Sequence, residues 1–181
     1  MAIIQAASCS SADVQTAINQ SINGDTVLVP SGTCTWNSGV TINKSITLSG
    51  MNTGCPNSCV DNTIIIENHS NASIKINADN VRISGITFKN RDVSNDNGGT
   101  INMYDSHIGV RIDHNKFQDQ GQTYGATRSM YIAHGKVRGD SDDGDPVQVL
   151  IDNNLFTANK SYKTLDLYGL EVTWKRSSEL G

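Results

Sequence analysis

The sequence predicts an all-β solenoid, a rod of stacked coils, and three observations carry this prediction. First, the segment VRISGITF at residues 81–88 returns as VRIDHNKF at 110–117 and as VLIDNNLF at 149–156. Second, equivalent hydrophobic residues keep a fixed offset, 29 residues between the first two copies and 39 between the last two. Third, apolar residues alternate with polar ones inside each copy, which is the periodicity of a β-strand. Units that repeat at such offsets bury their apolar faces against one another.

One amphipathic helix precedes the repeats. Residues 11–22 place four apolar side chains on one helical stripe, whereas no run of ten or more residues from Thr26 onward has a helical period. The stripe consists of Val14, Ala17, Ile18 and Ile22. The candidate caps are Ser10, Ser11 and Asp13 at the N-terminus and Gly24 at the C-terminus. We expect this helix, about residues 11–23, to close the lower end of the solenoid as a lid.

Aligning the repeats gives about five coils between residues 26 and 174, with turns rich in Asn, Gly, Asp and Ser. The first strands are expected at 40–42, 74–76, 101–103, 130–132 and 165–167. The second strands are expected at 46–48, 81–83, 110–112 and 149–151, with a further strand at 26–30 below the first complete coil. Stacked strands lie about 4.8 Å apart, so the rod would be only about 25 Å long. Its interior columns would be Ile83, Ile112 and Ile151, and Phe88, Phe117 and Phe156.

The far end of the rod has no counterpart of the helical lid. Residues 174–181 are polar and short, so the sequence predicts either a truncated chain or an end that a partner covers. End-to-end self-association at this uncapped C-terminal end is therefore expected.

Residues 12–50 carry a resemblance to a known family. Their sequence, ADVQTAINQSINGDTVLVPSGTCTWNSGVTINKSITLSG, combines the helix, a GDTV turn into a strand, a PSGT turn and a KSITLSG coil. It resembles the N-terminal entry segment of right-handed parallel β-helix proteins of the pectate-lyase-like superfamily. The later IDHNKF and IDNNLF segments are similar to the turns in which that superfamily stacks asparagines. The resemblance covers most of the chain and implies a right-handed parallel β-helix. It does not select a function, because lyases, hydrolases, epimerases, tailspikes and adhesins share the scaffold.

Composition indicates one domain, residues 1–181, of extracellular type. A chain of 181 residues with 16 glycines and 18% charged residues suits a turn-rich β protein. The net charge of −4 argues against nucleic acid as the main partner. No apolar run of about 18 residues exists, so no membrane span is expected. The first residues lack the pattern of a signal peptide, and we interpret them as the start of a mature domain that is secreted or held at the cell surface.

The four cysteines point to the same compartment. Four cysteines allow three pairings, and the pairing that we favour joins Cys9 to Cys34 and Cys55 to Cys59. The first bond would tie the helical lid to the first coil, and such bonds form in oxidising environments. A zinc site at Cys55 and Cys59 is the alternative, with His69 as the one further ligand close in sequence.

Function must reside on the outer face, because the interior is a packed core. Period 2 in the first strands places alternate side chains outside, and stacking aligns them in two columns. One column reads Lys75, Asn102, Tyr131 and Asp166, and its neighbour reads Asn77, Tyr104, Ala133 and Tyr168. Aromatic rings stack on sugars while amides and phenols hydrogen-bond hydroxyls, so this face predicts a polysaccharide groove. The ordinary preference of tyrosine for strands is the alternative explanation.

The second strands present a column of their own, which reads Thr47, Arg82, Arg111 and Leu150. Two arginines one coil apart repel each other unless an anion or nearby carboxylates compensate. A uronate or sulfate ligand is one explanation. Local ion pairs with Asp79 and Asp113 are the other, and the favoured one.

The repeat is broken between residues 120 and 146, where function tends to reside. The bases available there for catalysis are Arg128, Lys136 and Arg138. The acidic residues that follow resemble the start of a calcium loop, and they are Asp140, Asp142, Asp143 and Asp145. A solvated acidic loop is the alternative, because the terminal Glu of an EF-hand is missing.

Three functional hypotheses follow. In related lyases, calcium acidifies the C5 proton of a uronate and an Arg or Lys removes it, so a lyase that acts on an acidic glycan by β-elimination, with Ca²⁺ as cofactor, is one hypothesis that the resemblance offers. A non-catalytic carbohydrate-binding, adhesin-like or structural module needs only the columns. Hydrolysis by paired carboxylates is the third hypothesis. It would use Asp105, Asp113 or Asp166 and needs carboxyl groups about 5–9.5 Å apart.

Overall fold

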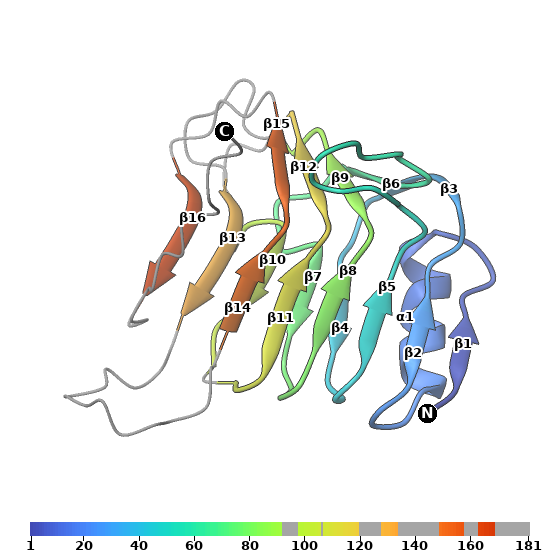
Figure 1. Ribbon diagram of the computed structural model, residues 1–181. Helices are drawn as coiled ribbons and strands as arrows, with labels where there is room; N and C mark the ends of the chain where they lie inside the picture. Colours follow the sequence, from blue (N-terminus) through green and yellow to red (C-terminus); the bar gives the residue numbers. More distant parts are fainter. Residues whose placement is uncertain (92–97, 106, 120–127, 134–148, 158–162, 169–181) are drawn as a thin grey trace.

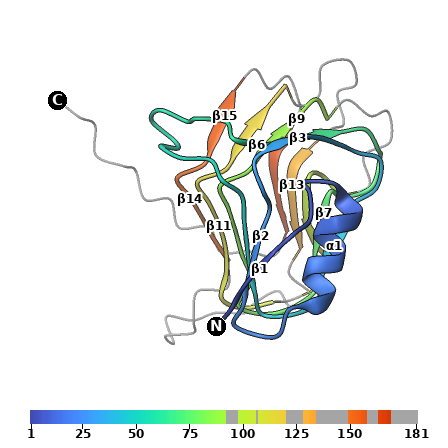
Figure 2. The same cartoon turned by 90° about the vertical axis from the view of Figure 1, so that its right-hand side faces the viewer.

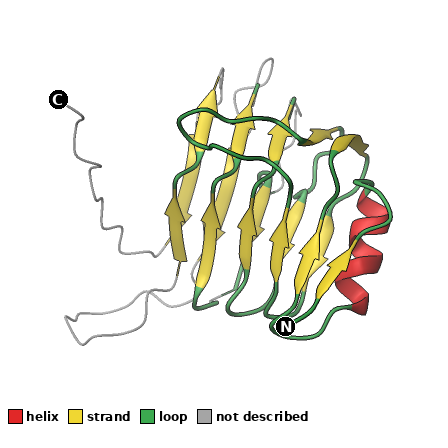
Figure 3. Ribbon diagram, turned by 45° about the vertical axis from the view of Figure 1, so that its right-hand side comes forward, coloured by secondary structure: helices red, strands yellow, loops and turns green. Residues whose placement is uncertain are grey.

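The computed structural model describes residues 1–91, 98–105, 107–119, 128–133, 149–157 and 163–168; for Arg128, Tyr131, Ala133 and residues 163–168 it describes the backbone alone. Three parallel β-sheets run along the molecule, and the described residues contain one α-helix (Figures 1 and 3). No helix within these ranges is long and apolar enough to cross a membrane. The protein is therefore all-β, and its regularly stacked parallel sheets fit a parallel β-helix.

The chain enters sheets A, B and C in turn. Sheet A contains, in spatial order, β1 (Ile3–Gln5), β2 (Thr26–Leu28), β5 (Thr47–Ser49), β8 (Arg82–Ser84), β11 (Val110–Asp113) and β14 (Val149–Asp152). Sheet B contains β3 (Gly32–Trp36), β6 (Thr63–Glu67), β9 (Thr87–Lys89), β12 (Lys116–Gln118) and β15 (Leu155–Thr157). Sheet C contains β4 (Val40–Ile42), β7 (Ile74–Ile76), β10 (Ile101–Met103), β13 (Arg128–Ala133) and β16 (Lys163–Tyr168).

The predicted strands correspond to two of these three sheets. The first strands of the coils are the strands of sheet C, and the second strands are β5, β8, β11 and β14 of sheet A, of which β5 and β8 begin one residue later than predicted. The sequence did not separate sheet B from sheet A, because the turn between them is short: Gly85 and Ile86 alone separate β8 from β9. It also missed β1, which pairs with β2 at the N-terminal edge of sheet A.

The two interior columns follow the predicted offsets. The column in sheet A consists of Ile83, Ile112 and Ile151, which are partners in adjacent strands. In sheet B, the ring centroids of Phe88 and Phe117 lie 5.4 Å apart, and those of Phe117 and Phe156 lie 5.0 Å apart. All six residues belong to the buried core or pack against it, so the predicted alignment of the repeats is confirmed.

The corner between sheets A and B is a tight turn with one residue at positive φ. The residues at this position are Gly85, His114 and Asn153, with φ angles of 71°, 55° and 53°. The next residue carries an amide in the upper coils: Asn154 Oδ1 accepts from the backbone N of Asn115 at 3.0 Å, and Asn115 Oδ1 accepts from the backbone N of Ile86 at 3.1 Å. The stacked amides thus satisfy backbone N–H groups that would otherwise be buried without a partner.

The helical lid is α1 (Ser11–Gln20), and its C-terminal end differs from the prediction. Ser10 is the N-cap, and its Oγ accepts from the backbone N of Asp13 at 3.2 Å. The buried residues of the stripe are Val14, Ala17 and Ile18. The placement of Ile22 on this stripe is wrong: it is 70% exposed, because the helix ends at Gln20. The role of Gly24 as terminator is wrong too, since Ser21 is the C-cap and Gly24, with φ 91°, serves the turn into β2.

Both predicted disulfide bonds are confirmed. They join Cys9 to Cys34 and Cys55 to Cys59, so no cysteine remains for zinc. The bond from Cys9 ties the segment before α1 to β3, and the indole Nε1 of Trp36 donates to the carbonyl of Cys9 at 2.8 Å beside it. Two disulfide bonds are compatible with an extracellular protein.

Candidate functional site

Sheet C aligns outward-facing positions from successive coils. Parallel pairing places Lys75 beside Asn102, Asn102 beside Tyr131, and Tyr131 beside Asp166. Thr41 pairs with Lys75 and extends the column by one strand toward α1. The predicted register of this column is therefore confirmed, and in the neighbouring column Ala133 pairs with Tyr168.

Four exposed side chains lie at the end of this face nearest α1, in β4 and β7 or directly after them. We call them the lysine patch: Thr41, Asn43, Lys75 and Asn77. Thr41 and Lys75 are strand partners. Ile42 and Ile76 are partners too, so Asn43 and Asn77, which follow them, lie next to each other at the ends of β4 and β7. The patch therefore surrounds one ammonium group with a hydroxyl and two amides, and contains no acidic side chain.

Lys75 differs from every other described Lys or Arg side chain, because it has no partner within the described part of the chain. The residues that form ion pairs are Arg82, Lys89, Arg91, Arg111 and Lys116. Lys44 donates to the carbonyls of Ile18, Asn19 and Ser21 at the end of α1. An exposed ammonium group on the strand next to the sheet edge, without a partner among the described side chains, is available to an anionic group of a ligand.

Asn102 is not on the surface, so its predicted exposure is wrong. Its register in the column is as expected, but its side chain is fully buried. The chain at Gly98 folds back against β10, and Asn102 Nδ2 donates to the Gly98 carbonyl at 3.0 Å. A Cβ at Gly98 would lie 2.3 Å from that Nδ2, so only glycine allows this approach. Strand periodicity has no signal for such a covering segment.

Tyr104 directly follows β10 and has 49% of its surface exposed, as expected of an outer position. Its phenol oxygen lies 3.3 Å from the point that a Cβ on Gly98 would occupy. The ring therefore extends back along β10 toward Gly98. A half-exposed ring beside a sheet offers part of its aromatic surface to a flat ligand.

A buried ion pair anchors the segments that lead into β7 and β10. Glu67 and Arg91 are both fully buried, and Arg91 Nη1 lies 3.2 Å from Glu67 Oε1. Glu67 also accepts hydrogen bonds from the hydroxyl groups of Ser73 and of Thr100, the latter at 2.7 Å. Burial lowers the pKa of the neighbouring His69, whose Nε2 lies 3.1 Å from Ser73 Oγ. This buried network joins the segments before β7 and β10, although His69 Nδ1 has no hydrogen-bond partner among the described residues.

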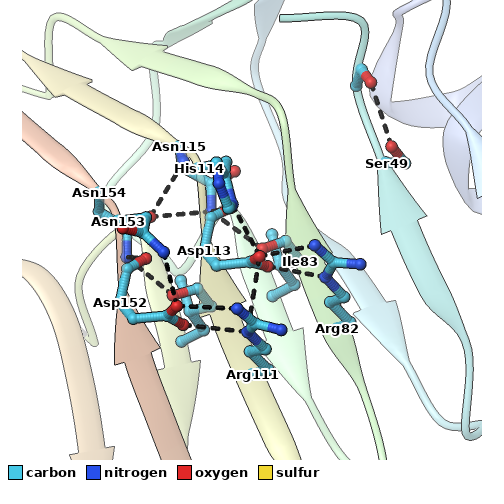
Figure 4. Close-up of polar contacts among 12 residues, drawn as sticks. Ser49, Arg82, Ile83, Arg111, Asp113, His114, Asn115, Asp152, Asn153 and Asn154 are labelled. Carbon is cyan, nitrogen blue, oxygen red and sulfur yellow. Dashed lines mark hydrogen bonds and ion pairs between the residues drawn. The ribbon is translucent and has the colours of Figure 1, made fainter. Parts of the chain in front are cut away.

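The arginine column on sheet A is a ladder of ion pairs (Figure 4). Arg82 donates to both carboxylate oxygens of Asp113, at 2.8 and 2.6 Å. Arg111 donates to both oxygens of Asp152, at 3.0 and 2.8 Å. Both guanidinium groups are thus neutralised by the next strand, which favours the ion-pair explanation over a uronate or sulfate site. The suggested compensation by Asp79 is wrong, since its Oδ1 instead lies 3.1 Å from His107 Nδ1.

Asp113 is the buried centre of this ladder. Burial raises the pKa of its carboxyl group, but hydrogen bonds from Arg82 and His114, together with the charges of Arg82 and Arg111, outweigh burial and hold the pKa below its usual range. Asp113 lies on sheet A, whereas Asp105 follows β10 of sheet C and Asp166 lies in β16. The carboxylates named for hydrolysis therefore do not all share one face.

Several predicted site residues lie outside the described side chains. For Arg128, Tyr131, Asp166 and Tyr168 the structure gives the backbone register alone. Outside the described residues lie Lys136, Arg138, Asp140, Asp142, Asp143 and Asp145. Within the described ranges, no three His, Cys, Asp or Glu side chains come together as a metal site. The catalytic bases and the calcium loop therefore remain predictions.

Comparisons of the chain with protein-family models, with curated proteins and with solved structures find no match. The class of the protein accordingly follows from its own fold, an all-β chain of stacked parallel sheets with two disulfide bonds. Its function must be argued from the chemistry of the outer faces.

Proposed function

We propose that this chain is an extracellular polysaccharide-binding protein, a single right-handed parallel β-helix of about five coils that is similar to the pectate-lyase-like superfamily. The ligand lies on the outer face of sheet C, across the lysine patch and Tyr104. The single observation that carries this proposal is Lys75: it is exposed on that face and has no partner among the described side chains. The paired arginines of sheet A offer no comparable site.

The chemistry of the face favours an acidic glycan. The ammonium group of Lys75 complements a carboxylate or sulfate, and its exposure means that solvent is displaced without breaking an internal ion pair. The amides of Asn43 and Asn77 both donate and accept, which suits sugar hydroxyls. Tyr104 adds a ring face for stacking. A flat sheet with these groups fits an extended polymer better than a small molecule, which would need a concave pocket.

Recognition without turnover is the form of the proposal that the described residues support. β-Elimination would further require a base among Arg128, Lys136 and Arg138 and a Ca²⁺ site at Asp140, Asp142, Asp143 and Asp145. These residues lie outside the described side chains, so the lyase hypothesis remains a prediction with its own assay.

The first experiment measures binding by isothermal titration calorimetry to three acidic polymers, polygalacturonate, alginate and chondroitin sulfate, with neutral dextran as the control. We expect at least one acidic polymer to bind more tightly than dextran, and its affinity to fall with added salt, because exposed charges are screened beyond about 8–10 Å. Failure of all three to bind would contradict the proposal.

The same three polymers test the lyase hypothesis when absorbance at 235 nm is followed with calcium and with a chelator. Absorbance that rises only with calcium would establish β-elimination. Binding without any rise would identify a non-catalytic module.

A further inference from the structure

The position of α1 in the fold extends sheet C by one element. In the later coils a strand of sheet C comes directly before each strand of sheet A, as β4 precedes β5 and β7 precedes β8. In the first coil it is α1 that comes directly before β2 of sheet A. The helix thus takes the place of a sheet C strand, and Figure 2 shows it on the same side of the molecule as β7 and β13.

One side chain of α1 pairs with the edge of sheet C as a neighbouring strand would. Gln15 Oε1 accepts from the backbone N of Thr41 at 2.7 Å, and Gln15 Nε2 donates to the carbonyl of Thr41 at 3.2 Å. The primary amide therefore satisfies a donor and an acceptor that the edge strand β4 would otherwise leave to solvent. Gln15 is held in one orientation by these two bonds.

Gln15 in turn positions Asn19, one helical turn further along. Gln15 Nε2 donates to Asn19 Oδ1 at 3.0 Å, although Asn19 is exposed. With its oxygen occupied, Asn19 directs its NH₂ group away from Gln15, and that group has no partner among the described residues. Fixing an exposed polar side chain before a ligand arrives lowers the entropy cost of binding.

We infer, on the basis of the proposed function, that the polysaccharide-binding face continues past β4 onto the cap helix, with Asn19 as a ligand contact and Gln15 as its positioning residue. The continuous strip consists of Asn19, Thr41, Asn43, Lys75 and Asn77, all exposed and none acidic. Its exposed groups are one ammonium group, one hydroxyl group and three amides, of which the Asn19 amide has its oxygen occupied by Gln15. The matching partner is an extended polymer rich in hydroxyl and carboxylate oxygens.

The test places a negative charge on each part of the strip and on a control face. Asn19→Asp adds a carboxylate on α1 and retains an oxygen for Gln15. Asn43→Asp adds one within the lysine patch, and Thr33→Asp adds one on exposed Thr33 of β3 in sheet B. Binding is measured with whichever of polygalacturonate, alginate and chondroitin sulfate the parent protein binds most tightly.

We expect Asn19→Asp and Asn43→Asp each to weaken binding about five- to tenfold through like-charge repulsion, and Thr33→Asp to change it less than twofold. The uncharged variant Asn19→Ala should weaken binding about threefold through loss of one donor. It also covers the case in which Asn19→Asp does not fold.

The outcomes separate the inference from the proposed function. If Asn43→Asp weakens binding while both Asn19 variants bind like Thr33→Asp, the binding face ends at β4 and the inference is overturned. If Asn43→Asp also has no effect, or if none of the three polymers binds, the proposed function fails and the inference falls with it.

Discussion

Replacing Asp113 by asparagine tests whether the ladder on sheet A is a stabilising element. Asp113 is fully buried, whereas 44% of the Arg82 side chain that bonds it is exposed. Breaking a fully buried ion pair costs about 3–5 kcal/mol, and exposed pairs contribute about 0.2–1 kcal/mol. Because 44% of the Arg82 side chain is exposed, we expect Asp113→Asn to lower the free energy of unfolding by an amount between these limits, about 2–3 kcal/mol. For a chain of this length that is a fall in Tm of roughly 5–10 °C.

The pH dependence of this loss follows from the depressed pKa of Asp113. A carboxyl group whose pKa is lower in the folded than in the unfolded state stabilises the protein fully above its unfolded pKa, which is about 3.9. That stability is lost as the pH falls through the folded pKa. The difference between the parent protein and Asp113→Asn should therefore be full at pH 7 and should shrink progressively below about pH 4.

Urea denaturation at pH 7, 5 and 3 measures this difference, with Asp152→Asn as the matched control. Asp152 forms the equivalent bonds to Arg111, but 26% of its side chain is exposed, so we expect a loss of only about 1 kcal/mol. Equal losses for the two variants, or a loss at Asp113 that does not change with pH, would refute the reasoning.

Three further changes test the packing of the fold. Phe117→Ala removes a fully buried ring that stacks on two others, and we expect urea denaturation to show a loss of about 3–5 kcal/mol in the free energy of unfolding. A loss of less than about 1 kcal/mol would mean that the ring is not in the core. Replacing both Cys9 and Cys34 by alanine opens a loop with a sequence separation of 25 and should lower the free energy of unfolding by about 3 kcal/mol. The same change at Cys55 and Cys59, with a separation of 4, should cost less, and the opposite order would contradict the chain-entropy explanation. Gly98→Ala places a methyl group against the Asn102 amide and should destabilise the protein by about 1–3 kcal/mol. It should also alter the near-ultraviolet circular dichroism of the tyrosines. Unchanged stability and an unchanged spectrum would show that the segment at Gly98 is not tightly packed.

The strands of sheets A and C and the interior columns could be predicted because they repeat. A period of 2 fixes which side chains share a face, and an offset of 29 residues fixes which strands are neighbours. Lys75 and Asn102 are 27 residues apart, so their pairing follows from aligning the apolar alternation of β7 with that of β10 and not from the offset of 29. The disulfide bonds were predictable as well, since Cys9 flanks the lid and Cys34 lies in the first coil.

The burial of individual outer residues could not be predicted from the same pattern. Asn102 occupies an outer position of its strand, yet the chain at Gly98 covers it. Glu67 ends β6 and Arg91 follows β9, 24 residues further along, and no repeated spacing links them, so nothing in the sequence indicated their ion pair. The bond between Gln15 and Thr41 is equally remote in sequence. Each of these contacts joins a strand residue to a residue outside the strands, and the repeat pattern carries no information on such contacts.

The most direct test of the central claim compares Lys75→Gln with Lys89→Gln by isothermal titration calorimetry on the acidic polymer that binds most tightly. Both variants remove one positive charge, but Lys75 lies on the outer face of sheet C, whereas Lys89 lies on sheet B, 3.8 Å from Asp119. A hydrogen bond to a charged group contributes about 1.5–3 kcal/mol, and exposure favours the lower end of that range. We predict that Lys75→Gln weakens binding about tenfold and that Lys89→Gln changes it less than twofold. Equal affinities for the two variants would contradict recognition of an acidic polysaccharide at this face.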